Sequence, residues 1–235
     1  MNEIFSAFYG AWMLILGGDP QLTGIVLLTL QVSLSAVAVA ACIGLPLGGL
    51  LAVAVFPGRQ ALVLLLNALM GLPPVVVGLL VYLLLSRAGP LGPWGLLFTP
   101  AAMVLAQVVL ITPIVGALAR QVIEDLWHEY REQLTSLGSS RARAVPTLLW
   151  DGRYSLLTSV LAGFGRAIAE VGAVLIVGGN IAHVTRVMTT TIALETSKGE
   201  LELAVGLGLV LITLSISVNL LVSLAGRWAH PGAAG

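Results

Sequence analysis

Charged residues are the side chains here that could do chemistry, and their distribution is very uneven. The chain has 11 basic and 11 acidic residues, and ten of them lie between Arg120 and Arg153. The sequence on both sides is almost entirely apolar. Such a segment can bind a water-soluble partner through ion pairs and hydrogen bonds. The ten residues are Arg120, Glu124, Asp125, Glu129, Arg131, Glu132, Arg141, Arg143, Asp151 and Arg153.

A second pair of charges, Arg166 and Glu170, is embedded in an apolar stretch. Four residues apart on a helix, the two side chains share one face and can pair. An unpaired charge at the middle of a bilayer costs about 2.5–3.5 kcal/mol. The pair could be a salt bridge that fixes its helix in a bundle, and Arg166 could border a translocation path and favour an oxyanion there. A gate or a dimer contact is the third interpretation.

Several other chemistries are not expected of this chain. It lacks the Gly-x-x-x-x-Gly-Lys-Ser/Thr phosphate loop, and Lys198 is its only lysine, so ATP chemistry would belong to another subunit. His128 and His183 lie in no cluster of metal-ligand type, and no nucleophile–base pair stands out. We therefore expect no metal site, no bound cofactor and no enzymatic activity, and the net charge of zero gives no hint of nucleic acid.

The elements that must position these charges are membrane helices. The chain of 235 residues is 58% hydrophobic and 9% charged, against about 25% charged residues in a soluble domain. Lipid offers no hydrogen-bond partners, and the apolar runs exceed 20 residues without alternation, so helices are favoured over a barrel. The sequence predicts an all-α integral membrane protein with five spans, over residues 22–56, 60–86, 101–119, 156–177 and 203–224.

The two ends of the chain and several breaks carry further expectations. Residues 1–18 are weakly amphipathic and too short to span, which predicts an interfacial helix, and 229–235 form a tail. Asp19 and Pro20 have the pattern of an N-cap followed by proline. Residues 44–49 are expected to bend the first span, and Pro73-Pro74 to bend the second, near a gate in one interpretation. Residues 183–202, which include Thr189–Thr191, are expected to form a polar outer loop.

The distribution of Lys and Arg predicts the orientation. Five spans put three basic residues on one side, namely Arg87, Arg186 and Lys198. The other side holds seven, namely Arg59, Arg120, Arg131, Arg141, Arg143, Arg153 and Arg227. The charged segment and the C-terminus are therefore expected in the cytoplasm, and the N-terminus outside.

Within the charged segment, residues 123–137 have the pattern of a short amphipathic helix. Leu126, Trp127, Tyr130 and Leu134 form its apolar stripe, and Gly138 suits a C-cap in the left-handed region. The exposed side of such a helix can dock in a groove on a soluble partner.

This segment resembles the EAA loop of ABC-importer permeases. The likeness rests on Glu132, on Gly138 six residues later, and on the Ser-Ser-Arg that follows. The chain departs from the family pattern at two places. Gln133 and Leu134 stand where the family usually has alanines, and Trp150-Asp151 replaces its closing Leu-Pro. In that family the loop is a coupling helix that fits a cleft in a cytoplasmic ATPase. The resemblance implies coupling through Tyr130, Arg131, Glu132, Gln133, Ser136, Leu137, Gly138, Ser139 and Arg141.

Two further motifs extend the resemblance over most of the chain. Residues 71–78 with 87–92 are similar to molybdate-type permeases, and residues 163–173 with 178–181 to tungstate-transport permeases. The resemblance implies a five-span type I ABC importer transmembrane domain over 19–228, with the coupling loop at 120–153. It also implies a homodimer, two copies of an ATPase that binds ATP and Mg²⁺, and an extracytoplasmic oxyanion-binding protein.

The substrate that the resemblance implies is tungstate, with molybdate or sulfate as alternatives. A different class is a secondary transporter driven by an ion gradient, which would be expected to show inverted repeats and several intramembrane carboxylates. The sequence shows one such carboxylate, Glu170, and no repeat. A membrane scaffold is a third class, which leaves the Glu132–Gly138 pattern without explanation.

Overall fold

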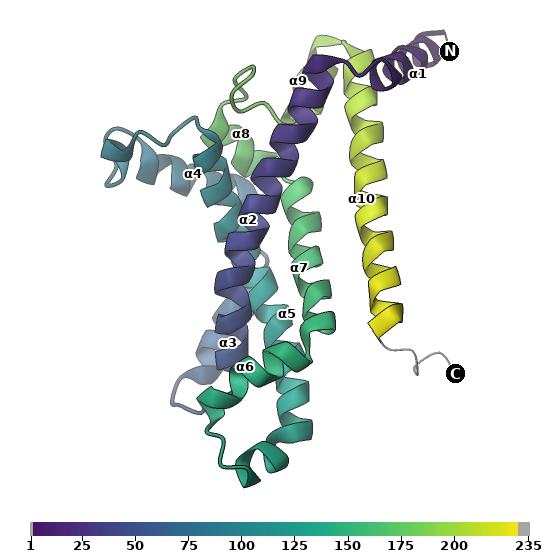
Figure 1. Ribbon diagram of the computed structural model, residues 1–235. Coiled ribbons are helices and arrows are strands. Elements are labelled where there is room, and N and C mark those ends of the chain that lie inside the picture. Colours follow the sequence, from purple (N-terminus) through teal and green to yellow (C-terminus); the bar gives the residue numbers. More distant parts are fainter. Residues whose placement is uncertain (1, 230–235) are drawn as a thin grey trace. The chain divides into compact units, whose positions relative to one another are not determined.

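The computed structural model describes residues 2–229, with side chains for residues 8–220. Its described elements are all helical, as predicted, and no strand occurs among the described residues (Figure 1). The helices are α1 (Asn2–Leu16), α2 (Pro20–Val53), α3 (Arg59–Leu69), α4 (Pro74–Leu85), the 3₁₀-helix η1 (Gly92–Trp94), α5 (Pro100–Ser136), α6 (Arg141–Asp151), α7 (Arg153–Ile168), α8 (Gly172–Gly178), α9 (Met188–Lys198) and α10 (Leu201–Ala229).

The membrane-spanning character of the chain is confirmed. Among the described residues, α2, α5 and α10 are each long and apolar enough to cross a bilayer. Two further pairs, α3 with α4 and α7 with α8, are apolar enough only when each pair is taken together. Counting each bent pair as one span gives five, so the chain is an all-helical, multi-pass membrane protein.

The bend predicted at Pro73-Pro74 in the second span is confirmed as a break between two helices, whereas the break in the fourth span corrects the expectation of a continuous helix. The helices α3 and α4 meet at 101°, and α7 and α8 meet at 59°. In the first break, Pro73 has extended backbone angles and Pro74 begins α4, because a proline disfavours the helical conformation of the residue before it. In the second break, Glu170 Oε1 accepts a hydrogen bond of 3.0 Å from Ala173 N in the first turn of α8.

The N-terminal prediction holds for the backbone. The helix α1 ends at Leu16, and Asp19 Oδ1 accepts a 2.8 Å hydrogen bond from Leu22 N, so Asp19 caps α2 as its sequence pattern predicts. The interfacial position of α1 stays a prediction, with which the exposure of Phe8 and Trp12 agrees. Of the predicted tail 229–235, all but Ala229 lies outside the described residues.

The chain divides into two compact units, and each is described by itself. The described part of the first comprises residues 2–36, 73–107 and 167–217. In it α4 packs against α8. Thr29 Oγ1, on α2, accepts a 2.9 Å hydrogen bond from Met188 N at the start of α9. Gln107 Nε2 donates one of 3.1 Å to Ala167 O.

The segment predicted as a polar outer loop over 183–202 contains a helix, α9, with buried threonines. Thr189, Thr190 and Thr191 are at most 7% exposed. Their hydroxyls bond to the protein itself: Thr189 Oγ1 donates to Glu170 O at 2.8 Å, and Thr191 Oγ1 to Val187 O at 2.7 Å. The expectation of an ordinary loop is therefore wrong, because intramolecular hydrogen bonds compensate the burial of these hydroxyls.

The described part of the second unit comprises residues 37–72, 108–166 and 218–229. Here α2 continues as one helix through residues 44–49, with Pro46 inside it, and the bend expected there stays a prediction. The glycine at 48 serves close packing, since a Cβ placed there would lie 2.3 Å from the carbonyl oxygen of Gly116 on α5. The absence of a side chain thus lets two helix backbones approach each other.

This packing predicts that Gly48→Ala destabilises the protein. A methyl group at this place would overlap the α5 backbone, and overpacking of this kind costs about 1–3 kcal/mol. Gly24→Ala is a matched control on the same helix, because a Cβ there meets nothing within 4 Å. Thermal unfolding of both variants in detergent measures the difference, and a Gly48→Ala protein as stable as Gly24→Ala would contradict the packing.

Candidate functional site

The charged segment forms a helical hairpin that we call the polar hairpin, comprising the end of α5 from Ile123, the turn 137–140 and α6. Gly138 in this turn has a φ of +77°, which confirms the predicted left-handed C-cap. Gly138 N donates to Thr135 O at 3.0 Å and Ser139 N to Leu134 O at 2.9 Å, which is the Schellman pattern. The predicted separate helix over 123–137 is instead the continuous end of α5.

One side of the polar hairpin is packed into the second unit. Ile123 on α5 and Val145 and Leu148 on α6 are buried in one apolar cluster with Ala52 and Val53 at the end of α2. The predicted apolar stripe packs against this cluster and consists of Leu126, Trp127, Tyr130 and Leu134. The hairpin is therefore fixed to the ends of α2 and α5 by burial of apolar surface.

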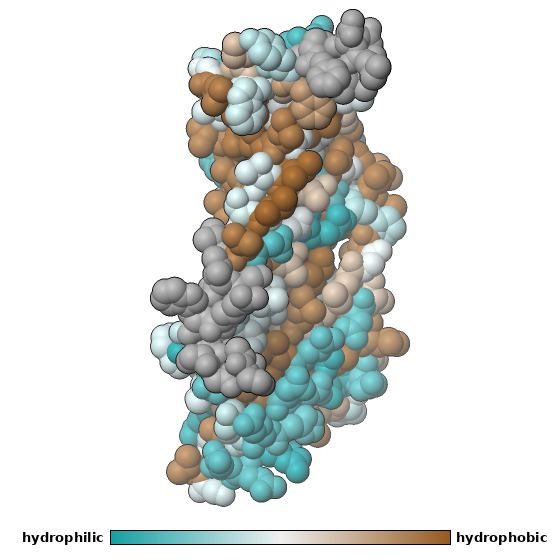
Figure 2. All heavy atoms as spheres, turned by 90° about the vertical axis from the view of Figure 1, so that its right-hand side faces the viewer, coloured by the Kyte–Doolittle hydropathy of each residue, from teal (hydrophilic) through white to brown (hydrophobic). Residues whose placement is uncertain are grey.

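The opposite side is open to solvent, and most of the predicted coupling residues lie there. Figure 2 shows hydrophilic residues gathered at this end of the molecule. The exposed ones are Arg131, Glu132, Gln133, Ser136, Leu137, Gly138 and Arg141, whereas Tyr130 and Ser139 are partly buried.

A groove of about 310 Å³ lies between the two helices of the polar hairpin. Leu137 at its tip is 84% exposed and Trp150 on α6 is 72% exposed. The groove is lined by Tyr130, Gln133, Leu134, Leu137, Thr147, Leu148, Trp150 and Asp151. Thr147, Trp150 and Asp151 were not among the predicted coupling residues, because α6 carries no pattern that places it opposite α5.

Trp150 is held in place although it is exposed. The guanidinium of Arg153 lies 5.1 Å from the centroid of the Trp150 ring and 4.5 Å from that of Tyr154. Arg153 Nη1 also donates a 2.8 Å hydrogen bond to Trp150 O. An aromatic side chain fixed by cation–π contacts loses little freedom on binding, which suits an anchor residue at an interface.

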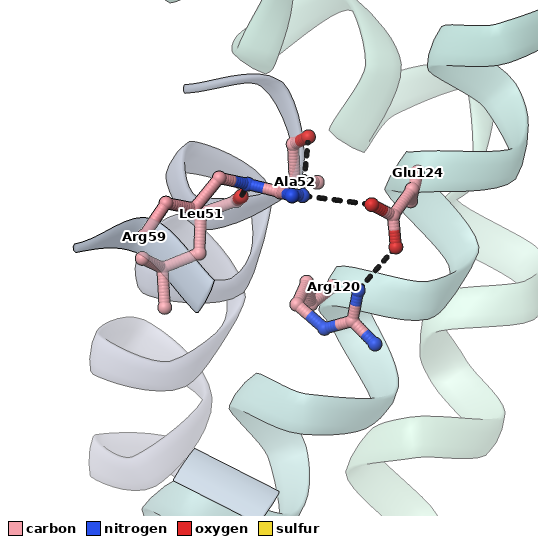
Figure 3. A network of polar contacts seen from close by, with 5 residues as sticks. All are labelled: Leu51, Ala52, Arg59, Arg120 and Glu124. Carbon is pink, nitrogen blue, oxygen red and sulfur yellow. Dashed lines mark hydrogen bonds and ion pairs between the residues drawn. The ribbon is translucent and has the colours of Figure 1, made fainter. Parts of the chain in front are cut away.

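An ion network joins the polar hairpin to Arg59 at the start of α3, and no local sequence pattern predicts it (Figure 3). Glu124 on α5 accepts from Arg59 Nη2 at 2.7 Å and from Arg120 Nη1. Arg59 also donates to the carbonyls of Leu51 at 2.8 Å and Ala52 at 3.2 Å. These are among the last carbonyls of α2, which no helical N–H satisfies.

The candidate path residues are placed separately. Arg166 lies in the last turn of α7, in the second unit, and Glu170 lies beyond the end of that helix, in the first. The prediction of one uninterrupted helix carrying Arg166 and Glu170 on the same face is therefore wrong. Pro73 and Pro74 form the α3–α4 break. A Cβ on Gly172 would lie 3.7 Å from Glu170 Oε1 and 3.6 Å from Val75 N, so Glu170 lies near the start of α4.

The network predicts that Glu124→Gln destabilises the second unit. The substitution removes the carboxylate between two partly buried guanidiniums, and leaving such charges uncompensated costs about 1–3 kcal/mol or more. Asp125→Asn is the control, since it removes an exposed carboxylate from the next position. A lower unfolding temperature for Glu124→Gln alone is expected, and equal temperatures for the two variants would mean that the network adds no stability.

Comparison with known proteins gives consistent matches. The family described as "Binding-protein-dependent transport system inner membrane component" matches residues 44–234. The chain is 40% identical over 193 residues to a probable anion ABC transporter permease protein of Haloferax volcanii, covering 79% of this chain and 83% of the relative. It is 38% identical over 200 residues to the tungstate uptake permease of Peptoclostridium acidaminophilum, covering 85% of this chain and 88% of the relative. It is 37% identical over 200 residues to the tungstate uptake permease of Campylobacter jejuni, covering 85% of this chain and 84% of the relative.

Proposed function

Because the chain belongs to the family of inner-membrane components of binding-protein-dependent transport systems, we propose that it is the membrane-spanning subunit of an ATP-driven tungstate importer. The observation that carries the proposal is the polar hairpin, whose exposed Leu137 and Trp150 border a groove. The relatives named for tungstate support the substrate. Molybdate and sulfate, which are also tetrahedral divalent oxyanions, are the alternatives.

The partners follow from the same proposal. An extracytoplasmic binding protein delivers the oxyanion, and a cytoplasmic ATPase docks on the polar hairpin and binds ATP and Mg²⁺. The complex contains two copies of this chain and two of the ATPase. The excess of Lys and Arg on the side of the hairpin supports a cytoplasmic hairpin and C-terminus, with the N-terminus outside.

The contacts of the second unit suggest how ATPase movement reaches the membrane helices. The apolar cluster fixes α6 to the ends of α2 and α5, and Glu124 ties Arg59 at the start of α3 to the same helix, α5. A push on the polar hairpin therefore moves these helix ends together, because packed elements of this kind shift as bodies rather than deform. Closure of the two ATPases would in this way alternate access across the membrane.

The broken helices are the candidate gate. Interrupted helices in membrane proteins are tolerated where the irregular backbone is buried in protein or lines a cavity, and transporters use such breaks at their substrate paths. Here one break holds Pro73 and Pro74, and the other comprises residues 169–171, with Glu170 inside it and Arg166 in the last turn of the helix before it. We place the oxyanion path beside these breaks, with the guanidinium of Arg166 favouring an anion.

Docking on the polar hairpin predicts that Trp150→Ala weakens ATPase binding by about tenfold or more, since removal of an aromatic interface anchor costs at least about 1–2 kcal/mol. Trp94→Ala is a matched control, because Trp94 on η1 is similarly exposed at 68% and lies on the opposite side in the proposed orientation. Affinity is measured by titrating the solubilised permease with its ATPase. Equal affinities for the two variants would contradict docking at α6.

Reconstitution tests the substrate and the path together. Proteoliposomes with permease, ATPase and binding protein should take up tungstate only when ATP reaches the ATPase, and Arg166→Ala should lower this uptake strongly while the complex still assembles. Full uptake by Arg166→Ala would rule out its pathway role. Uptake of molybdate or sulfate but not tungstate would reassign the substrate, and uptake driven by an ion gradient without ATPase would support a secondary transporter.

A further inference from the structure

A small cavity lies in the first unit, between the start of α2 and the loop that follows α8. It encloses about 190 Å³, more than ten times the roughly 15 Å³ that one water molecule requires. Its lining combines apolar side chains with three polar ones, Gln21, His183 and Arg186. The complete lining is Pro20, Gln21, Gly24, Ile25, Leu28, Ala182, His183 and Arg186. All of these residues belong to the first unit.

Arg186 in this cavity lacks the partners that a guanidinium of limited exposure normally has. Its Nε is buried, and no hydrogen bond from it is found within the described part of the chain. No ion pair joins Arg186 to a described carboxylate either. A buried donor of a charged group without a partner costs about 1–3 kcal/mol or more, so native proteins rarely keep one unless a ligand or solvent satisfies it.

The nearby carboxylate of Asp19 has another contact. Asp19 directly precedes the cavity-lining Pro20, and its Oδ1 accepts the N–H of Leu22 as the cap of α2. The side chains that Gln21 and Arg186 contribute to the cavity are hydrogen-bond donors, and a neutral imidazole at His183 also offers one N–H. The lining thus combines a positive charge with donors, which suits an anion.

The loop that carries His183 and Arg186 is held in one conformation. Thr185 Oγ1 donates to Gly178 O at 2.6 Å and accepts from Ile181 N at 2.9 Å. Asn180 Oδ1 accepts from Thr190 Oγ1 at 3.0 Å. Asn180 and His183 have φ values of +50° and +62°, which residues other than glycine rarely adopt. A loop fixed in this way holds the cavity-lining side chains in place before a ligand arrives.

We propose that this cavity binds a small tetrahedral oxyanion, with Arg186 as the principal contact and His183 and Gln21 as further donors. A planar guanidinium can donate two parallel hydrogen bonds to two oxygens of one anion, and the remaining oxygens face the donors of the other two residues. The inference rests on the proposed function, which places the cavity on the outer side. There it holds the transported oxyanion between its release from the binding protein and its passage through the membrane.

Equilibrium binding of labelled tungstate to the purified permease–ATPase complex tests this site. We expect saturable binding by the wild type, at least tenfold weaker binding by Arg186→Gln and a smaller loss by His183→Ala. Arg87→Gln is the matched control, because it removes an exposed arginine from the same side without touching the cavity. Thermal unfolding separates binding from folding: a guanidinium without a protein partner predicts that Arg186→Gln is at least as stable as the wild type.

A phosphate of a membrane lipid has the same tetrahedral chemistry, and native mass spectrometry of the complex distinguishes it. A phospholipid retained by the wild type and lost in Arg186→Gln would support the anion site and assign it to lipid. Tungstate binding by Arg186→Gln with wild-type affinity, or no anion on the wild type, would overturn the site. If the wild-type complex imports no oxyanion but loses tungstate binding with Arg186→Gln, the proposed function fails while the site stands.

Discussion

The inability of lipid to solvate charges and unpaired backbone groups is the constraint on which the rest of this structure depends. It makes the spans helical and excludes most charged residues from them, so that ten of the charges collect between Arg120 and Arg153. Near the ends of α2 and α5, Glu124 is paired with Arg59 and Arg120. The polar residues thereby form a fixed element rather than a loose connector.

That element has two sides with different physical roles. Its buried side joins α6 to the ends of α2 and α5 through the cluster around Ile123, Val145 and Leu148. Its exposed side presents Leu137 and Trp150 around a groove, and the position of Trp150 is fixed by Arg153. In the proposed transporter, a contact made on the exposed side would be transmitted to these helix ends through packed atoms. The two sides of the polar hairpin thus offer a physical basis for the coupling of ATPase and membrane helices that membership of a transporter family implies.

Local patterns predicted local structure well, and non-local contacts could not be predicted. The caps at Asp19 and Gly138 could be predicted because a helix cap depends only on neighbouring residues. The apolar stripe through Leu126 and Leu134 packs as predicted. Its helix is continuous with the third span, because no glycine or proline lies between the two. Hydropathy could not locate the helix break before Gly172, since the residues next to it on both sides are apolar apart from Arg166 and Glu170.

The contacts that sequence reasoning missed join residues far apart in the chain. Arg59 and Glu124 are separated by 65 positions, and the cavity around Arg186 depends on the start of α2 lying beside a loop about 160 residues later. The three threonines at 189–191 were expected in a loop because a polar run resembles one. Their burial depends on acceptors such as Glu170 O and Asn180 Oδ1, which only the folded chain supplies.

Site-directed cross-linking tests the central claim, that the polar hairpin is the ATPase-docking element, most directly. The chain has a single cysteine, Cys42, so a Cys42→Ser background leaves one introduced thiol to react. Leu137→Cys places this thiol at the exposed tip of the hairpin, and Trp94→Cys places it on η1. We predict that a short thiol-specific cross-linker joins the ATPase to Leu137→Cys and not to Trp94→Cys. Cross-linking at position 94 alone, or equally at both, would contradict the claim.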